Sequence, residues 1–139
     1  MTVNCFLDTN VILYAVSRRG SEASKYLRAF EILEGARFAT SAQVLQEFFV
    51  NATRKIPKPL TVPEATIWIE KLAIRPVVAI TEGLVASAIL ASTRFKTSYW
   101  DGALIAAAEQ VKAPILYSED LNHGQLYGSV RVVNPFRSN

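Results

Sequence analysis

A single acid between two apolar runs near the start of the chain constrains the fold more than any other feature. Residues 3–7 form a short apolar run, Asp8-Thr9-Asn10 interrupts it, and a second apolar run begins at Val11. Short apolar runs with β-branched and aromatic members are typical of buried strands, and Thr or Asn before a new apolar segment is typical of a helix start. We therefore expect Asp8 at the carboxyl end of a buried strand, where a desolvated carboxylate requires a cation or a hydrogen-bonding partner.

Segments of strand length alternate with segments of helical periodicity along the rest of the chain. The expected strands cover residues 3–7, 37–39, 76–80, 114–117 and 130–133. The expected helices cover residues 10–16, 21–34, 40–54, 61–72, 81–92 and 99–111, and residues 121–128 form a loop. Alternation of this kind predicts an α/β fold with a central, mostly parallel sheet of about five strands and helices on both faces.

Polar residues mark the helix starts. Thr40 with Gln43, and Thr61 with Glu64, have the spacing of a capping box, in which each side chain bonds the backbone of the other residue. Ser98 precedes a helix that is rich in alanine, and small residues allow a helix to pack close against a sheet.

The composition is that of one folded domain spanning residues 1–139. Half of the residues (50%) are hydrophobic and 19% are charged, which argues against disorder. No apolar stretch reaches the ~18 residues of a membrane span, and no signal-peptide pattern opens the chain, so we expect a cytoplasmic protein. Cys5 is the single cysteine and is expected to be a buried strand residue. The formal net charge of +3 is compatible with a polyanionic partner.

Four acids are expected to meet at one edge of the sheet. Asp8 and Asp120 each follow an expected strand, Asp101 lies in the first turn of a helix, and Glu47 lies in the second turn of a helix that follows a strand. Ligand sites of open α/β sheets lie at this carboxyl edge. Converging carboxylates repel one another unless cations lie between them, and such hard oxygen ligands favour magnesium or manganese over zinc.

Each acid taken alone also has a structural interpretation. Asp101 has capping-box spacing from Ser98, Glu47 could be an exposed helix residue, and Asp120 could be an ordinary turn residue. Asp8 is harder to explain in this way, because it lies between two apolar runs. The common placement of all four acids favours a functional site.

The acids lie in motifs that resemble those of the PIN domain, and the set is most similar to the VapC-type ribonuclease toxins of toxin–antitoxin pairs. These motifs are Leu7-Asp8-Thr9-Asn10, Glu47-Phe48-Phe49, Trp100-Asp101-Gly102-Ala103 and Tyr117-Ser118-Glu119-Asp120-Leu121. The resemblance implies a three-layer α/β/α fold and a magnesium- or manganese-dependent endoribonuclease. It also implies an antitoxin protein that holds the enzyme inactive, and a homodimer.

The resemblance assigns catalytic and metal-binding roles to Asp8, Glu47, Asp101 and Asp120, with one or two Mg²⁺ or Mn²⁺ ions. The metal would lower the pKa of a bound water, and the resulting hydroxide would attack the RNA phosphate in line and leave a 5′-phosphate and a 3′-hydroxyl. The same resemblance implies supporting roles for Thr9, Asn10 and Ser118. Glu119 is an additional acid, which either points outward or assists.

Basic residues near the same edge are expected to hold the RNA backbone, which would make binding depend on salt. These residues are Arg18, Arg54, Lys55, Arg94 and Lys96. The lone histidine, His123, is either a loop residue or a further RNA contact.

Two other functions remain open. A catalytically silent PIN-like module that binds RNA or protein would use the same fold without the reaction. A phosphatase of the haloacid dehalogenase kind also begins with an aspartate after its first strand, but it needs a second aspartate two residues later, where this chain has Asn10.

Overall fold

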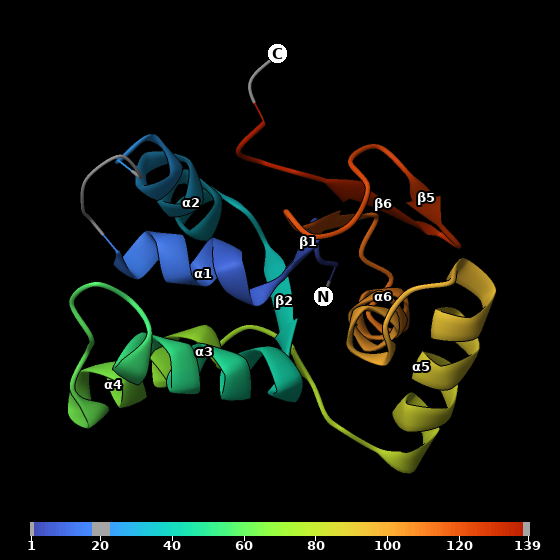
Figure 1. Ribbon diagram of the computed structural model, residues 1–139, viewed down its shortest axis with the longest axis horizontal. Coiled ribbons are helices and arrows are strands. Elements are labelled where there is room, and N and C mark those ends of the chain that lie inside the picture. The colour runs from blue at the N-terminus through green and yellow to red at the C-terminus, as the bar shows by residue number, and fades with distance from the viewer. Residues whose placement is uncertain (1, 18–22, 138–139) are drawn as a thin grey trace.

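Helices and strands alternate along the chain in the computed structural model, which describes residues 2–17 and 23–137 (Figure 1). The strands are β1 (Cys5–Leu7), β2 (Phe38–Ser41), β3 (Val77–Val78), β4 (Ile115–Tyr117), β5 (Leu126–Tyr127) and β6 (Val130–Val133). The helices are α1 (Thr9–Val16), α2 (Ala23–Gly35), α3 (Ala42–Arg54), α4 (Val62–Leu72), α5 (Glu82–Phe95) and α6 (Tyr99–Gln110). The expected start of α2 at Ser21 lies outside the described residues.

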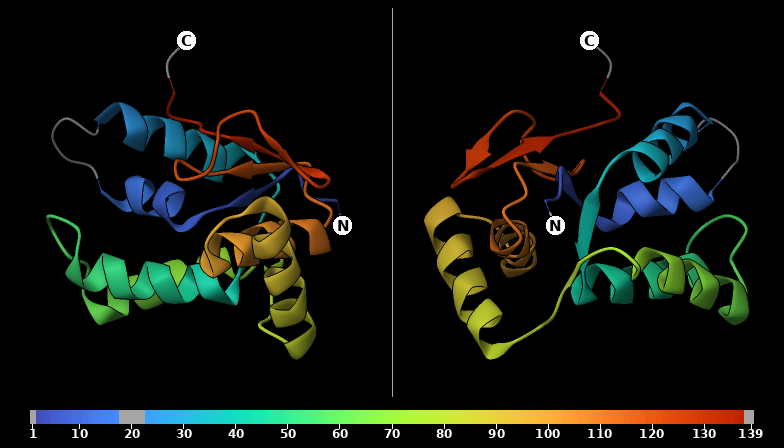
Figure 2. Two further views of the ribbon diagram at one scale, coloured as in Figure 1. Left: turned by 45° about the vertical axis from the view of Figure 1, so that its right-hand side comes forward. Right: turned by 180° about the vertical axis from the view of Figure 1, so that it is seen from behind.

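The strands form a single sheet in the order β3-β2-β1-β4-β6-β5. All neighbouring strands are parallel except β5, which runs antiparallel to β6. Helices α1 to α4 lie together on one side, and α5 and α6 lie on the other (Figures 1 and 2). The three-layer α/β/α fold with a mostly parallel sheet is therefore confirmed. The chain passes from β1 outward to β2 and β3 and returns on the other side of β1 as β4, so the strand order reverses between β1 and β4.

Strand β1 is buried on both of its faces. Cys5, Phe6 and Leu7 have exposed fractions of 1%, 0% and 0%, which explains the continuous apolar run in the sequence. Burial raises the pKa of the Cys5 thiol to about 11, so the thiol stays protonated at neutral pH. Cys5 is a core residue, as expected. Among the described residues, no helix has the length and apolar character needed to cross a membrane.

Two local expectations are wrong. Thr40 does not cap α3, because it continues β2 and its backbone N–H donates to the Pro76 carbonyl at 3.0 Å. Ser41 is the cap instead, and its hydroxyl accepts from the Val44 N–H at 3.2 Å. The loop expected at residues 121–128 contains β5, a strand too short to show any period, so the sheet has six strands rather than about five. The capping box of Thr61 with Glu64 is confirmed.

Close packing between α5 and α6 depends on a glycine. The central part of α6 is buried, and its small side chains allow the approach that the sequence indicates. At Gly102, an added Cβ would lie 2.8 Å from the Ala88 carbonyl oxygen and 2.8 Å from the Ser92 Cβ. Both are far closer than ordinary contact, and the first is backbone that cannot rotate away. Gly102 therefore sets the distance between α5 and α6, and α6 is the helix that contains Asp101.

We expect Gly102→Ala to lower the free energy of unfolding by roughly 1–3 kcal/mol, because overpacking forces the two helices apart. Gly83→Ala is the matched control, since its Cβ would meet only the Thr81 Oγ1 at 3.8 Å in the first turn of α5. Urea unfolding followed by circular dichroism measures both variants. Equal stability of the two variants would contradict this account of the packing.

Candidate functional site at the carboxyl edge of the sheet

Asp8 lies at the point where the strand order reverses, and both of its carboxylate oxygens accept hydrogen bonds. Its backbone N–H donates to the Tyr117 carbonyl at 3.1 Å, which continues the pairing of β1 with β4. Its Oδ1 accepts from the Thr9 N–H at 2.7 Å, so Asp8 caps α1, and its Oδ2 accepts from the Ser118 hydroxyl at 2.9 Å. The residue is only 5% exposed. The buried carboxylate thus has the partners that its burial requires.

Ser118 connects Asp8 to Asp120. It directly follows β4, is fully buried, and its hydroxyl donates to Asp8 while accepting from the backbone N–H of Asp120 at 3.1 Å. The spacing of Ser118 and Asp120 in the fourth motif has a physical basis: one hydroxyl is bonded to one acid and holds the backbone of the other.

Glu47 approaches the same edge from α3. Its Oε1 accepts from the Thr9 hydroxyl at 3.5 Å and from the Gln43 amide at 3.3 Å. Gln43 also lies 3.5 Å from the Trp100 carbonyl, in the first turn of α6. The starts of α1 and α6 are therefore linked through the first two turns of α3. The sequence suggested only a capping-box role for Gln43, with Thr40, although it lies one helical turn before Glu47 on the same polar face.

Asp101 lies in the first turn of α6 and is half-buried. Its backbone N–H donates to the Ser98 hydroxyl at 3.1 Å, but the reciprocal bond from the Ser98 backbone to the Asp101 carboxylate is absent between these two described residues. At α4 both halves of the box are present. The carboxylate of Asp101 is therefore not used to cap its helix, which weakens the structural interpretation of this acid.

The four acids share one electrostatic field. The pKa of Asp8 is raised to about 6. Burial is the main cause, and repulsion from Asp120 and Glu47 also raises the pKa, while the hydrogen bonds from Ser118 and Thr9 lower it. The pKa of Asp120 is also raised, first by desolvation and then by repulsion from Asp101 and Glu119. Asp101 therefore joins the group through Asp120.

The site opens outward from Asp8. Asp8 is buried, Asp101 is half-buried, and Glu47 and Asp120 are exposed. Within the described ranges, no three histidine, cysteine or acidic side chains form a ready-made metal cage. The donor set consists of carboxylate and hydroxyl oxygens, and its charges repel one another. Such a set fits a hard divalent cation such as Mg²⁺ or Mn²⁺, which keeps several water ligands.

Glu119 points to a different set of partners than the four acids. It forms an ion pair with Lys25 at 2.9 Å and accepts a hydrogen bond from the Tyr14 hydroxyl at 2.9 Å. Sequence reasoning found neither partner, because nothing in the local pattern connects residues so far apart along the chain. Asn10 is half-buried in the first turn of α1.

The basic residues expected to hold RNA have varied positions. Lys55 lines a shallow hollow of about 290 Å³ along α3 together with Glu47, so it shares a surface with one of the four acids. Arg94 packs on the Phe95 ring at 4.8 Å, and Lys96 ends α5 in the left-handed conformation (φ 55°), in the turn before α6. Arg54 is exposed in the last turn of α3. Arg18 lies outside the described residues.

His123 has a structural contact. Its Nδ1 accepts from the backbone N–H of Asn134 at 3.0 Å, which ties the loop before β5 to the end of β6. This contact agrees with the loop-residue interpretation and leaves the expected RNA contact untested.

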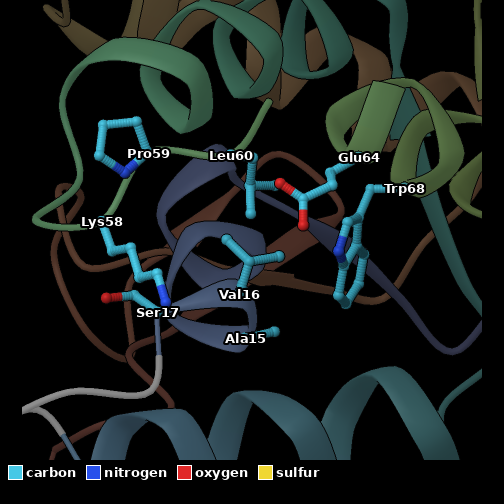
Figure 3. Close-up of a pocket in the computed structure, with 8 residues that line it drawn as sticks. All are labelled: Ala15, Val16, Ser17, Lys58, Pro59, Leu60, Glu64 and Trp68. Atoms are coloured by element: carbon cyan, nitrogen blue, oxygen red, sulfur yellow. The ribbon is translucent and has the colours of Figure 1, made fainter. Parts of the chain in front are cut away.

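A hollow of about 490 Å³ lies at the other end of α1 from Asp8 (Figure 3). It is lined by the end of α1, the loop before α4 and one face of α4: Ala15, Val16, Ser17, Lys58, Pro59, Leu60, Glu64 and Trp68. None of the four acids lines it. The acid cluster is instead an open surface at the sheet edge, which suits a polymer better than an enclosed small molecule.

The protein is an open α/β fold in which four acids lie near the point where the strand order reverses. The chain belongs to the PIN domain family, because the model of that family matches residues 5–128. No curated protein sequence matches the chain.

Several solved structures have a similar fold. A toxin–antitoxin complex from Klebsiella pneumoniae has a TM-score of 0.70 at 17% identity and covers 94% of this chain and 97% of its own. VapC20 from Mycobacterium tuberculosis, a sarcin–ricin loop cleaving toxin, has a TM-score of 0.65 at 17% identity, with coverage of 84% and 89%. VapBC2 from Rickettsia felis, bound to a promoter DNA fragment, has a TM-score of 0.60 at 13% identity, with coverage of 92% and 96%.

The raised pKa of Asp8 predicts how stability depends on pH. The folded protein holds this proton more tightly than the unfolded chain, so the stability that the neutral carboxyl contributes is present below about pH 4 and is lost as the pH rises through about 6. Asp8→Asn stays neutral throughout. In EDTA, its free energy of unfolding relative to wild type should therefore rise by up to about 3 kcal/mol between about pH 4 and pH 8.

Urea unfolding at several pH values measures this difference. Glu70→Gln removes an exposed carboxylate from α4 and serves as the control, with no comparable trend. A pH-independent difference between wild type and Asp8→Asn would show that Asp8 is not desolvated in the folded protein.

Proposed function

We propose that the chain is a metal-dependent endoribonuclease and the toxin of a VapBC-type toxin–antitoxin pair. The observation that carries this proposal is the buried Asp8 carboxylate, with Glu47 and Asp120 close enough to raise its pKa. Concentrated negative charge of this kind costs stability unless a cation compensates it. Membership of the PIN domain family adds independent support.

The residues would divide the work according to their burial. Asp8, Glu47, Asp101 and Asp120 would hold one or two Mg²⁺ or Mn²⁺ ions. When bound, such an ion neutralises charge on the scissile phosphate and lowers the pKa of water at the site. Asp8, as the buried member, would anchor the ion, and the exposed Glu47 and Asp120 would face the phosphate and the attacking water.

Hydroxyl groups around the acids would keep them oriented. The Ser118 hydroxyl donates to Asp8, and the Thr9 hydroxyl donates to Glu47. Asn10, in the same turn as Thr9, would support the site in a similar way. The bond from Ser118 favours the charged form of the Asp8 carboxylate, which is the form that binds a cation.

The surroundings support RNA as the substrate. Glu47 and Asp120 are exposed, and Lys55 shares a hollow with Glu47, while Arg54 lies in the last turn of α3 and Arg94 and Lys96 lie at the end of α5. In-line attack by water would leave a 5′-phosphate and a 3′-hydroxyl. The chain has one histidine, so the paired histidines of ribonucleases that use the 2′-hydroxyl are not available.

The toxin role rests on the similar structures, two of which are described as a toxin–antitoxin complex and a sarcin–ricin loop cleaving toxin, and a third as VapBC2. We propose a small antitoxin partner on this basis. We also propose a homodimer. Among the apolar residues of α3 and α4, Phe48 and Leu72 belong to the core, while Leu45, Phe49, Val50 and Ile69 line an open apolar hollow that would supply its interface.

Replacing any one acid should abolish cleavage. We expect Asp8→Asn and Asp101→Asn to lower the rate of Mn²⁺-dependent RNA cleavage by at least about 100-fold, since even outer-shell partners of a metal site contribute 10- to 100-fold. The measurement is cleavage of a mixed RNA substrate by the purified chain, with the product ends identified by phosphatase and ligase treatment. Glu70→Gln is the control carboxylate and should cleave normally.

Normal cleavage by Asp8→Asn would contradict the enzyme proposal. RNA binding by the wild type without any cleavage in Mn²⁺ would favour the silent PIN-like module instead.

Trp100 offers a surface for an RNA base. It directly precedes Asp101, it is 64% exposed, and the Tyr99 ring meets its ring edge-on at 5.0 Å. Stacking of a base on an aromatic ring contributes roughly 1–3 kcal/mol. We expect Trp100→Ala to lower kcat/KM about tenfold, mainly through KM, and Trp100→Phe to keep most of the activity.

Steady-state kinetics on a short RNA measures this effect. Ile74→Ala removes an even more exposed apolar side chain, 82% exposed, beyond the end of α4, and should leave kcat/KM unchanged. An unchanged KM in Trp100→Ala would exclude the stacking contact.

A further inference from the structure

A cluster of three polar side chains joins two helices to the loop that carries Asp120. The Glu119 carboxylate accepts from the Tyr14 hydroxyl at 2.9 Å through Oε1 and from the Lys25 ammonium at 2.9 Å through Oε2. The Lys25 ammonium also donates to the Tyr14 oxygen at 3.1 Å. Tyr14 belongs to α1 and Lys25 to α2, so the three bonds close a triangle between α1, α2 and the loop after β4. We name this triangle the Glu119 clamp.

Aromatic rings cover the Glu119 clamp. The Lys25 ammonium lies 4.7 Å from the centre of the Tyr14 ring and 5.8 Å from that of Phe136. The two rings meet edge-on at 4.8 Å, and the side chains of Lys25 and Glu119 are 31% and 20% exposed. Partial burial and cation–π contact make this ion pair stronger than an exposed one, which contributes little.

The Glu119 clamp lies between two residues of the acid site. Ser118 precedes Glu119 and donates to Asp8, while Asp120 follows it and donates its backbone N–H to Ser118. The short segment is therefore held from two directions: the Ser118 hydroxyl holds it toward β1, and the Glu119 carboxylate holds it toward α1 and α2. Because Ser118 and Glu119 are both held in place, the backbone of Asp120, which directly follows them, has little freedom.

We propose that the Glu119 clamp is a positioning device, in which Lys25 and Tyr14 hold Glu119 away from the acid site and thereby fix the direction of Asp120 for cation binding. This proposal rests on the proposed metal-dependent function. Lys25 and Tyr14 touch neither the substrate nor the cation in this arrangement, and they act only through Glu119. The ion pair also compensates the charge of the fifth acid beside the cluster, so that Glu119 does not compete for the cation.

The first test needs no metal. Hydrogen exchange is measured by mass spectrometry on the whole protein in EDTA, comparing wild type with Lys25→Met. Peptides that cover residues 118–121 should exchange about tenfold faster in the variant, because amides exchange through local opening and the variant loses one of the two bonds that hold the Glu119 carboxylate. Peptides from α5 and α6 should be unchanged. Lys71→Met removes an exposed lysine from α4 and is the matched control.

The second test measures Mn²⁺ binding by calorimetry. Lys25→Met should weaken binding roughly tenfold, as expected for residues that orient metal ligands, and Lys25→Arg should restore most of the affinity. In a double-mutant cycle, Lys25→Met should add little to Asp120→Asn, because both act through Asp120, but should add fully to Glu47→Gln. A lysine that merely stabilised the fold would add equally to both.

The outcomes separate the two proposals. Wild-type exchange rates at residues 118–121 in Lys25→Met would overturn the clamp, and so would faster exchange with unchanged Mn²⁺ affinity. Failure of the wild-type protein itself to bind Mn²⁺ would instead contradict the metal-dependent function, and it is read without any variant.

Discussion

The hydrogen bond from Ser118 to the buried Asp8 carboxylate is the interaction on which the site depends. It joins the ends of β1 and β4, the two strands between which the strand order reverses. A carboxylate at this position has lost most of its water, so each oxygen requires a donor, and Thr9 and Ser118 provide them. The same bond aligns the segment that carries Asp120. The order of the strands in the sheet thus decides which acids lie close together.

Around this bond, the four acids differ in burial: Asp8 is buried, Asp101 is half-buried, and Glu47 and Asp120 are exposed. Burial raises the pKa of Asp8 to about 6, whereas Glu47 and Asp120 are exposed to solvent. A cation can approach such a site without crossing the core, and a polymer can lie across it. The helices contribute position rather than chemistry: α3 carries Glu47, and the contact of α5 with α6 at Gly102 sets where Asp101 stands.

Much of the fold and the position of Asp8 could be predicted from the sequence, because the signals involve residues close together in the chain. An apolar run that ends in an acid, with a hydroxyl or amide after it, specifies a strand end and a helix cap within a few residues. The errors arose where local signals compete. Thr40 and Ser41 are both good caps, and the pairing of Thr40 with Val77 on β3, together with its bond to the Pro76 carbonyl, decided between them. Strand β5 was missed because two residues carry no period, and it forms only against β6.

The sequence by itself determined the alternation of strands and helices and the burial of Cys5 and its neighbours. It also placed the four acids at the same edge of the sheet. All of these follow from periodicity and spacing. Only the tertiary structure decided which acid does what. Glu119 and Asp120 are adjacent and chemically alike, and their difference comes from Lys25 and Tyr14, which the fold brings from α2 and α1. Contacts between residues about a hundred positions apart depend on how helices pack over a sheet, and no local pattern encodes that packing.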